Sequence, residues 1–334
     1  MAITLTIPLD QDGAHHGFLR LPYSRDDSAW GSVMIPISVI RNGSGPTALF
    51  VAGNHGDEYE GLIALHELAS TLEPGAIRGR VIVLPALNQP AVAAAKRTSP
   101  IDSGNMNRSF PGRADGTVTQ KIAEYVSRVL VPQADLVCDL HSGGRTLDFL
   151  PFAAVHVLED KVQQAACEAA MAAFNAPWSA IMLEIDAVGM LDTEVESQGK
   201  VFVTTELGGG GSATAASVAI ARKGVRNLLC HMGILPHAPE IAPTRMIDMP
   251  DVDCFTFCDS AGLMEPLVDL GATVEKGDAI ARIWPLGQPG QAAKLFHAGR
   301  GGILVARHFP GLIQPGDCLG VVAVPLDSPV DRAG

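Results

Sequence analysis

The sequence contains no window of about 18 uninterrupted apolar residues, which a membrane-spanning helix would need. It also lacks the basic amino-terminal segment and following apolar stretch of a secretory signal. Basic residues form no run and are outnumbered: 24 Lys and Arg against 36 Asp and Glu give a formal net charge of −12. Such a charge repels phosphate backbones and anionic membrane surfaces. We therefore expect a cytoplasmic protein that binds neither nucleic acid nor membranes.

Cysteine is scarce as well, with six residues in a chain of 334 and no Cys-x-x-Cys pair. Most of these cysteines lie in apolar surroundings, which favours buried, reduced thiols over disulfides or a zinc knuckle. Charged residues make up only 18% of the chain, whereas hydrophobic residues make up 47%. This balance is typical of a compact globular protein and argues against disorder and against a charge-rich halophilic surface.

The chain is long enough for about two domains. Between residues 33 and 235, strand-like runs alternate with helical ones, which predicts an α/β domain with a mixed or largely parallel sheet flanked by helices. The predicted strands are residues 33–40, 47–52, 80–85, 135–140, 152–157 and 201–206, and the predicted helices are residues 57–72, 117–130, 160–174 and 212–232. A long loop at residues 88–116 interrupts the pattern, and loops of this length inside compact domains are usually functional.

A second domain is expected to begin near residue 245. Residues 238–250 are rich in proline, and beyond them short Val, Ile and Leu runs are broken by glycines. Two Gly-Asp turns, at residues 277–278 and 316–317, precede apolar strands and resemble the barrel-sandwich fold of biotinyl and lipoyl carriers. No segment has the flanked lysine that a carrier would modify. We therefore interpret residues 245–334 as an all-β domain that supports or closes an active site formed by residues 1–244.

The most informative stretch is residues 50–61, where an apolar strand ends in a glycine turn and the next helix is expected to present His55 and Glu58 on one face. An imidazole and a carboxylate three residues apart can share one Zn²⁺. The spacing alone is weak, because residues 156–159 and 237–240 repeat it. Only the first pair follows a strand end in a strand-turn-helix context, which is where open α/β sheets place their sites.

A third ligand is expected from another strand end. The apolar run at residues 136–140 delivers His141 into a glycine turn, and strand alternation places Asp139 on the same side, where it could orient the imidazole. The strand at residues 201–206 likewise ends at Glu206 before a glycine turn. A carboxylate near water that a metal activates can act first as base and then as acid. Each residue also has a structural alternative. His141 would cap its strand by hydrogen bonding, and Glu206 would be a buried glutamate without a catalytic role.

Within the long loop, residues 96–112 contain two arginines, Arg97 and Arg108, and also Asn107. Arginine suits bidentate binding of a carboxylate and charge stabilisation of an oxyanion, so two arginines on one loop suggest both tasks. A solvated basic loop is the alternative.

Taken in order, the segments singled out are His55-x-x-Glu58, Arg97, Asn107-Arg108, His141-Ser142 and Glu206. This order resembles the zinc carboxypeptidase-like fold and, more narrowly, the succinylglutamate desuccinylase/aspartoacylase family. The resemblance covers nearly the whole chain, because that family also has a C-terminal β domain. It implies one Zn²⁺ per subunit, held by His55, Glu58 and His141, and a homodimer. It also implies hydrolysis of a small N-acyl amino acid to an amino acid and a carboxylic acid, without a covalent intermediate.

The same resemblance implies that Arg97 polarises the scissile amide carbonyl, that Asn107 and Arg108 hold the substrate α-carboxylate, and that Glu206 promotes the attack of water. Two departures stand out. The loop has methionine before Asn107 where the family commonly has leucine. Residues 181–203 contain neither the tyrosine nor the arginine with which aspartoacylases bind an acidic substrate side chain, so an aspartate-like substrate is not expected.

That stretch is acidic instead, with five carboxylates at Glu184, Asp186, Asp192, Glu194 and Glu196. If some of them face the pocket, the substrate side chain should be cationic; a solvated acidic helix is the alternative. The segments at residues 189–193 and 204–211, together with the pattern of the whole chain, are most similar to the branch of the family that removes acetyl from N2-acetyl-L-2,4-diaminobutyrate in ectoine degradation. Hydrolysis of N-succinylglutamate or another N-acyl amino acid is the main alternative, and a non-enzymatic metal-binding module is a more remote one.

Overall fold

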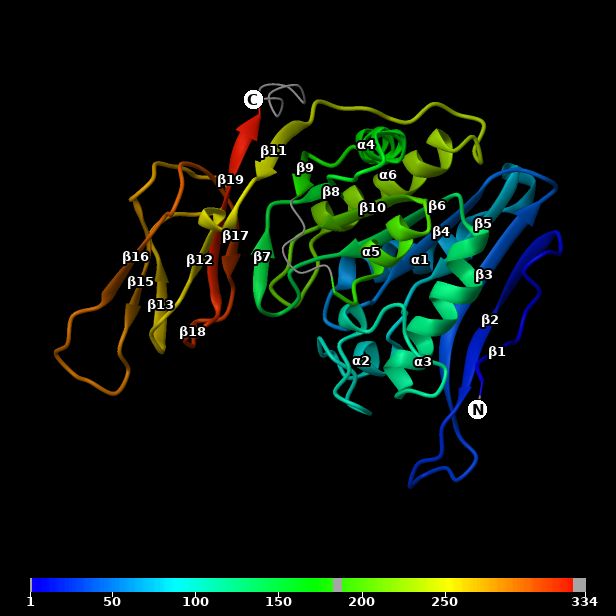
Figure 1. Ribbon diagram of the computed structural model, residues 1–334, viewed down its shortest axis with the longest axis horizontal. Helices are drawn as coiled ribbons and strands as arrows, with labels where there is room; N and C mark the ends of the chain where they lie inside the picture. Colours follow the sequence, from blue (N-terminus) through cyan, green and yellow to red (C-terminus); the bar gives the residue numbers. More distant parts are fainter. Residues whose placement is uncertain (1, 183–187, 327–334) are drawn as a thin grey trace.

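The computed structural model describes residues 2–182 and 188–326 (Figure 1). Within these residues the main sheet has 15 strands, in the order β1-β2-β3-β5-β4-β6-β10-β8-β9-β11-β19-β17-β14, with β12 paired to β19 and β7 paired to β17. Its strands are β1 (Thr4–Leu5), β2 (Gly13–Pro22), β3 (Ser32–Asn42), β4 (Thr47–Ala52), β5 (Gly79–Leu84), β6 (Leu136–His141), β7 (Leu147–Phe149), β8 (Phe152–His156), β9 (Trp178–Met182), β10 (Val201–Glu206), β11 (Arg245–Met249), β12 (Phe255–Phe257), β14 (Thr273–Val274), β17 (Gly302–His308) and β19 (Cys318–Leu326).

Helices cover both faces of the central strands (Figure 1). The α-helices of the described chain are α1 (Tyr59–Thr71), α2 (Gln89–Ala93), α3 (Val118–Tyr125), α4 (Lys161–Phe174), α5 (Leu191–Ser197) and α6 (Ala215–His231). Helices α1, α4 and α6 contribute to one hydrophobic core, and α3 and α5 contribute to the core on the opposite face. None of the helices in the described residues is both long and apolar enough to cross a membrane.

The two cores explain why β4 is apolar from Ala48 to Ala52. All six of its residues are buried. Phe50 and Ala52 pack into the core of α1, α4 and α6, whereas Leu49 and Val51 pack into the core of α3 and α5. Successive side chains point to opposite faces of a strand, so a strand covered on both faces reads as a continuous hydrophobic run.

The centre of the sheet brings three strand ends together. Strands β5, β4, β6 and β10 pair in parallel, and in the register of β6 with β10 His141 lies opposite Glu206. The carboxyl ends of β4, β6 and β10 therefore meet at one edge of the sheet, where open α/β folds place their sites. The side chains that follow β4 join the same edge.

The C-terminal segment forms a second sheet and also extends the first. Strands β13 (Gly262–Pro266), β15 (Ala279–Trp284), β16 (Lys294–His297) and β18 (Leu312–Ile313) make a four-stranded antiparallel sheet. The boundary expected at residue 245 coincides with the start of β11, which pairs with β9 on one side and with β19 on the other. The main sheet thus runs across this boundary, and a division into two independent domains stays a prediction.

The mixed α/β fold with flanking helices and a mainly β C-terminal segment is confirmed. The predicted strand at residues 201–206 coincides with β10. Strands β1, β2, β7 and β9 and helix α5 were not predicted from the sequence. Helix α5 is only seven residues long, about two turns, which gives little hydrophobic periodicity to detect.

Candidate active site

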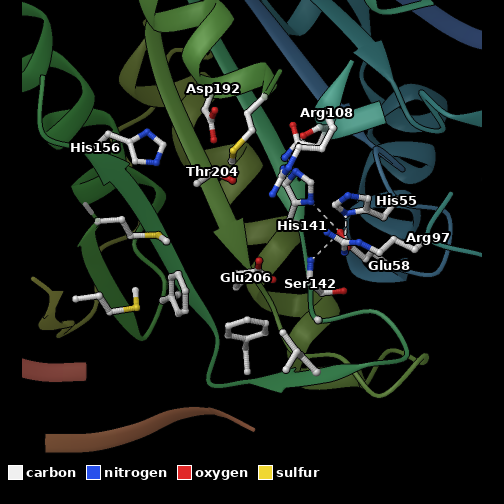
Figure 2. Close-up of a pocket in the computed structure, with 18 of the residues that line it drawn as sticks. His55, Glu58, Arg97, Arg108, His141, Ser142, His156, Asp192, Thr204 and Glu206 are labelled. Atoms are coloured by element: carbon white, nitrogen blue, oxygen red, sulfur yellow. Dashed lines mark hydrogen bonds and ion pairs between the residues drawn. The ribbon is translucent and has the colours of Figure 1, made fainter. Parts of the chain in front are cut away.

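All seven side chains singled out from the sequence line one cavity of about 310 Å³ (Figure 2). They are His55, Glu58, Arg97, Asn107, Arg108, His141 and Glu206. The apolar part of the wall includes Leu147, Phe149, Phe152, Met182, Met249 and Phe255. Met249 and Phe255 come from beyond residue 244, so the C-terminal segment contributes to the cavity.

The expectation that His55 and Glu58 lie on a helix is wrong. His55 lies in the turn after β4, and Glu58 is the N-cap of α1 with an extended backbone, φ −112° and ψ 105°. The turn needs glycine at two places: Gly53 has φ +70°, and a Cβ on Gly56 would lie 2.0 Å from the backbone carbon of Ala91. The tight turn, rather than helical spacing, brings the two side chains together.

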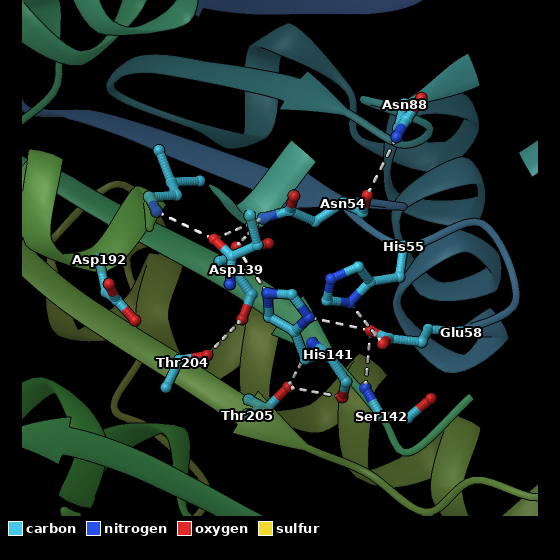
Figure 3. A network of polar contacts seen from close by, with 12 residues as sticks. Asn54, His55, Glu58, Asn88, Asp139, His141, Ser142, Asp192, Thr204 and Thr205 are labelled. Carbon is cyan, nitrogen blue, oxygen red and sulfur yellow. Dashed lines mark hydrogen bonds and ion pairs between the residues drawn. The ribbon is translucent and has the colours of Figure 1, made fainter. Parts of the chain in front are cut away.

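His55, Glu58 and His141 form a buried group that could hold a metal ion. One ligand atom from each lies within 4.8 Å of the others. The Nδ1 atom of His55 is 2.7 Å from Oε1 of Glu58, and the Nδ1 atom of His141 is 2.9 Å from Oε2 (Figure 3). Two imidazoles and a carboxylate are the set that catalytic zinc sites use, with a further position left open.

The other ring nitrogens of the two histidines contact outer partners. Nε2 of His141 lies 2.8 Å from Oδ2 of Asp139, as strand alternation predicted, and Nε2 of His55 lies 3.2 Å from Oδ1 of Asn105. Asn54 donates to the same Asp139 oxygen at 2.8 Å. Such partners fix the ring orientation and leave Nδ1 of each ring directed at Glu58, where the three side chains could hold a metal ion. The donor set and its supports therefore fit a zinc ion.

Asn54 and Asn105 were not singled out from the sequence. Asn54 directly precedes His55, and Asn105 stands two residues before Asn107 in the long loop. Asn105 also accepts a hydrogen bond from the backbone N–H of Asn107, a local turn for which asparagine is favoured. That local signal alone does not predict that Asn105 reaches His55, because the two residues are 50 positions apart.

Burial and charge shift the titration of this group. Burial lowers the pKa of His55, against the opposing effect of Glu58. Burial would raise the pKa of Glu58, but the adjacent His55 and His141 hold it well below its usual range. For His141, burial would lower the pKa, yet the Asp139 and Glu58 carboxylates raise it well above 6.5. The group thus concentrates negative charge between two imidazoles, which suits a divalent cation.

Glu206 ends β10 beside this group. Burial, with a further contribution from the Glu58 carboxylate, raises the pKa of Glu206 to about 8. Its Oε2 atom is buried and has no hydrogen-bond partner in the described chain. An unpartnered carboxyl oxygen in a cavity, with a pKa near neutrality, is able to accept and return a proton.

The long loop places its three nominated residues, Arg97, Asn107 and Arg108, in the wall of the cavity. Nη1 of Arg97 is 3.6 Å from Oε1 of Glu58, and the Arg97 side chain is 46% exposed. Oδ1 of Asn107 accepts from the backbone N–H of Leu191 at 2.9 Å, and Nη1 of Arg108 donates to the backbone oxygen of Asn107 at 2.6 Å. Within the described residues, Arg97 and Arg108 are the only Lys or Arg side chains that line the cavity.

Comparison with known proteins decides the family. The family model described as the succinylglutamate desuccinylase/aspartoacylase catalytic domain matches residues 44–232. The chain belongs to the succinylglutamate desuccinylase/aspartoacylase family. The membership expected from the order of the site segments is confirmed.

Three similar proteins match this chain along almost their whole length. A Halomonas elongata protein named N-alpha-acetyl-L-2,4-diaminobutyric acid deacetylase is 50% identical over 328 residues, which is 98% of this chain and 96% of that protein. The product-bound structure of the ectoine utilization protein EutE (DoeB) from Ruegeria pomeroyi is 62% identical with a TM-score of 0.95, covering 96% of this chain and 98% of that one. A succinylglutamate desuccinylase/aspartoacylase from Rhodobacter sphaeroides is 37% identical with a TM-score of 0.93, covering 98% of this chain and all of that one.

Proposed function

We propose that the protein is a zinc-dependent amidohydrolase that converts N2-acetyl-L-2,4-diaminobutyrate to acetate and L-2,4-diaminobutyrate in ectoine degradation. The observation that carries the proposal is the buried His55, Glu58 and His141 group with the unpartnered Glu206 carboxyl in the same cavity. The name of the Halomonas elongata protein supports this substrate, and the name of the Ruegeria pomeroyi protein supports a role in ectoine degradation.

His55, Glu58 and His141 would hold one zinc ion per subunit. When bound there, zinc would act as a Lewis acid that polarises a carbonyl oxygen and acidifies water. Arg97, next to Glu58, would stabilise the negative charge that develops on the amide oxygen. Asn107 and Arg108 would bind the α-carboxylate, because an amide and a guanidinium offer parallel N–H donors to it.

Glu206 would move the proton. As a carboxylate it accepts a proton from the water whose oxygen attacks the amide carbon, and it returns that proton to the nitrogen when the C–N bond breaks. The products are acetate and the free amino acid, and no covalent bond to the protein forms. The raised pKa of Glu206 suits the second half of this exchange, because the protonated form is then readily available.

The main alternative substrate, N-succinylglutamate or another acidic N-acyl amino acid, has less support. It would bring a further carboxylate into a cavity whose two arginines already have roles. A non-enzymatic metal-binding module has less support still, because it would have no use for Glu206. Hydrolysis assays on N2-acetyldiaminobutyrate, N-acetylaspartate and N-succinylglutamate, each with and without a chelator, test the proposal. Metal-dependent release of acetate from the first is expected, and preference for either acidic compound would refute it.

We further propose a cytoplasmic location, a barrel-sandwich C-terminal segment and a homodimer. The described cysteines are free, and five of the six are buried, which supports a reducing compartment such as the cytoplasm. The barrel-sandwich character of the C-terminal segment is supported by its four-stranded antiparallel sheet. A homodimer follows only from the family resemblance, and light scattering of the purified protein would test it.

A further inference from the structure

Asp192 is a buried carboxylate inside the same cavity. The residue is only 6% exposed, it lines the cavity, and Figures 2 and 3 show its carboxylate directed into the space on the side of Thr204. Its Oδ1 atom accepts two hydrogen bonds from the next residue, Thr193, through the backbone N–H at 2.6 Å and the hydroxyl at 3.2 Å. Its Oδ2 atom makes no hydrogen bond or ion pair with any residue that the structure describes. One carboxylate oxygen is therefore held in place while the other is open to a ligand.

A largely buried carboxylate without a cation beside it is only partly compensated, here by the two hydrogen bonds that Oδ1 accepts from Thr193. Arg97 and Arg108 line the cavity, but neither forms an ion pair with Asp192 among the described contacts. The nearby His156 is already paired with Glu196, with Nδ1 3.0 Å from Oε1. A ligand that carries its own positive charge would compensate Asp192.

The position of Asp192 is tied to the loop that would bind the substrate α-carboxylate. Oδ1 of Asn107 accepts the backbone N–H of Leu191, which directly precedes Asp192. The backbone N–H of Phe110 donates to the carbonyl of Gly189 at 3.0 Å, so a second bond joins the same loop to the turn before α5. The segment that carries Asp192 is thereby tied to the loop that carries Asn107 and Arg108, which suits a ligand with a carboxylate at one end and an ammonium a few bonds away.

Two of the four other acidic residues nominated from the sequence are engaged elsewhere. Glu196 is paired with His156, and Glu194 accepts a hydrogen bond from Gln198 at 2.7 Å without lining the cavity. Glu184 and Asp186 lie outside the described residues. Among the described acids of this stretch, Asp192 is the one whose carboxylate faces the cavity with an oxygen to spare.

We propose that Asp192 determines specificity by binding the side-chain ammonium of the substrate through Oδ2. The assignment rests on the proposed function and deepens it, because it names the group that distinguishes a diamino acid from neutral and acidic amino acids. The ammonium would donate to Oδ2 in a site shielded from water, where a charge-assisted hydrogen bond is strong.

The test compares two substrates of the same shape. N2-acetyl-L-2,4-diaminobutyrate ends in an ammonium, and N-acetyl-L-norvaline ends in a methyl group at the same position. The variant is Asp192→Asn, which keeps an oxygen for Thr193 and replaces Oδ2 by an uncharged amide. The matched control is Glu194→Gln, which makes the same change two residues further along the same helix, outside the cavity.

In Asp192→Asn, we expect kcat/KM for the cationic substrate to fall about 10- to 100-fold, the range for a lost hydrogen bond to a charged group, with little loss for the norvaline compound. Glu194→Gln should leave both values unchanged. If the ratio of the two kcat/KM values stays at the wild-type value in Asp192→Asn, including the case in which both fall together, the assignment is wrong. If the wild-type protein does not hydrolyse N2-acetyl-L-2,4-diaminobutyrate at all, the proposed function fails instead.

A second measurement does not depend on the folding of the variant. L-2,4-diaminobutyrate and L-norvaline are compared as inhibitors of the wild-type enzyme. The assignment predicts that the cationic product inhibits at least about tenfold more tightly than L-norvaline, because a hydrogen bond to a charged group contributes about that factor to binding. Equal inhibition by the two amino acids would overturn it.

Discussion

Replacing Glu206 by Gln should abolish most of the turnover while leaving the zinc site intact. The substitution keeps the shape of the side chain but removes the oxygen that would accept the proton of the attacking water. In the structure this oxygen, Oε2, is buried and unpartnered, so no other described group of the protein competes for it. General base catalysis is worth about 10²- to 10⁴-fold, which corresponds to about 3–5 kcal/mol in the activation barrier.

The assay is the initial rate of acetate release from N2-acetyl-L-2,4-diaminobutyrate, with the zinc content of each preparation measured in parallel. Glu60→Gln is a matched control. Glu60 is also buried, also has a raised pKa, mainly because of burial, and also has one buried oxygen without a partner, Oε2, in the described chain. Its side chain differs from that of Glu206 in that it does not line the cavity. We expect Glu60→Gln to keep nearly wild-type turnover and Glu206→Gln to lose at least about 10²-fold at equal zinc content.

Two results would refute the reasoning about Glu206. Turnover within a factor of about two of wild type would show that Glu206 carries no proton in the rate-limiting step. A loss of turnover that merely follows a loss of zinc would show that the residue supports the metal rather than the reaction.

Three further predictions concern the metal site. His141→Ala should lower the zinc content of the purified protein, and full occupancy would place the third ligand elsewhere. Asp139→Asn, which keeps the shape of the group that orients His141, should weaken zinc affinity by about 10- to 100-fold in a chelator competition, and an unchanged affinity would mean that the contact with Nε2 does not matter. In protein stripped of metal, the free energy of unfolding should fall as the pH rises from about 4.5 to about 8, because the folded state keeps on Glu206 a proton that the unfolded state releases. Urea titrations should show a shallower fall in Glu206→Gln than in wild type, and parallel curves would show that the pKa of Glu206 is not raised.

The strand ends that carry the site could be predicted from the sequence, because they depend on local pattern. The apolar run that becomes β6 delivers His141 to its end, and two-residue alternation places Asp139 on the same side. The strand that ends in Glu206 was predicted with the bounds that it has. Such features follow from the chain within a few residues, and the family resemblance could therefore be recognised from their order.

Contacts between distant segments could not be predicted in the same way. That Asn105 reaches His55, and that Asn107 holds the start of α5, depends on how a loop folds over a sheet edge. The acidic stretch left two interpretations open, a carboxylate in the pocket or a solvated acidic helix, and periodicity did not decide between them, because α5 itself was missed. Only tertiary packing separates Asp192, which faces the cavity, from Glu196, which pairs with His156.

The central claim is that this cavity selects and deacetylates a cationic N-acetyl amino acid. Its most direct test is the ratio of kcat/KM for N2-acetyl-L-2,4-diaminobutyrate to that for N-succinyl-L-glutamate, measured on the same zinc-loaded preparation. The account predicts a ratio of at least about 10², because the acidic compound lacks the ammonium and places a carboxylate near Asp192. A ratio near one, or a preference for N-succinyl-L-glutamate, would contradict it.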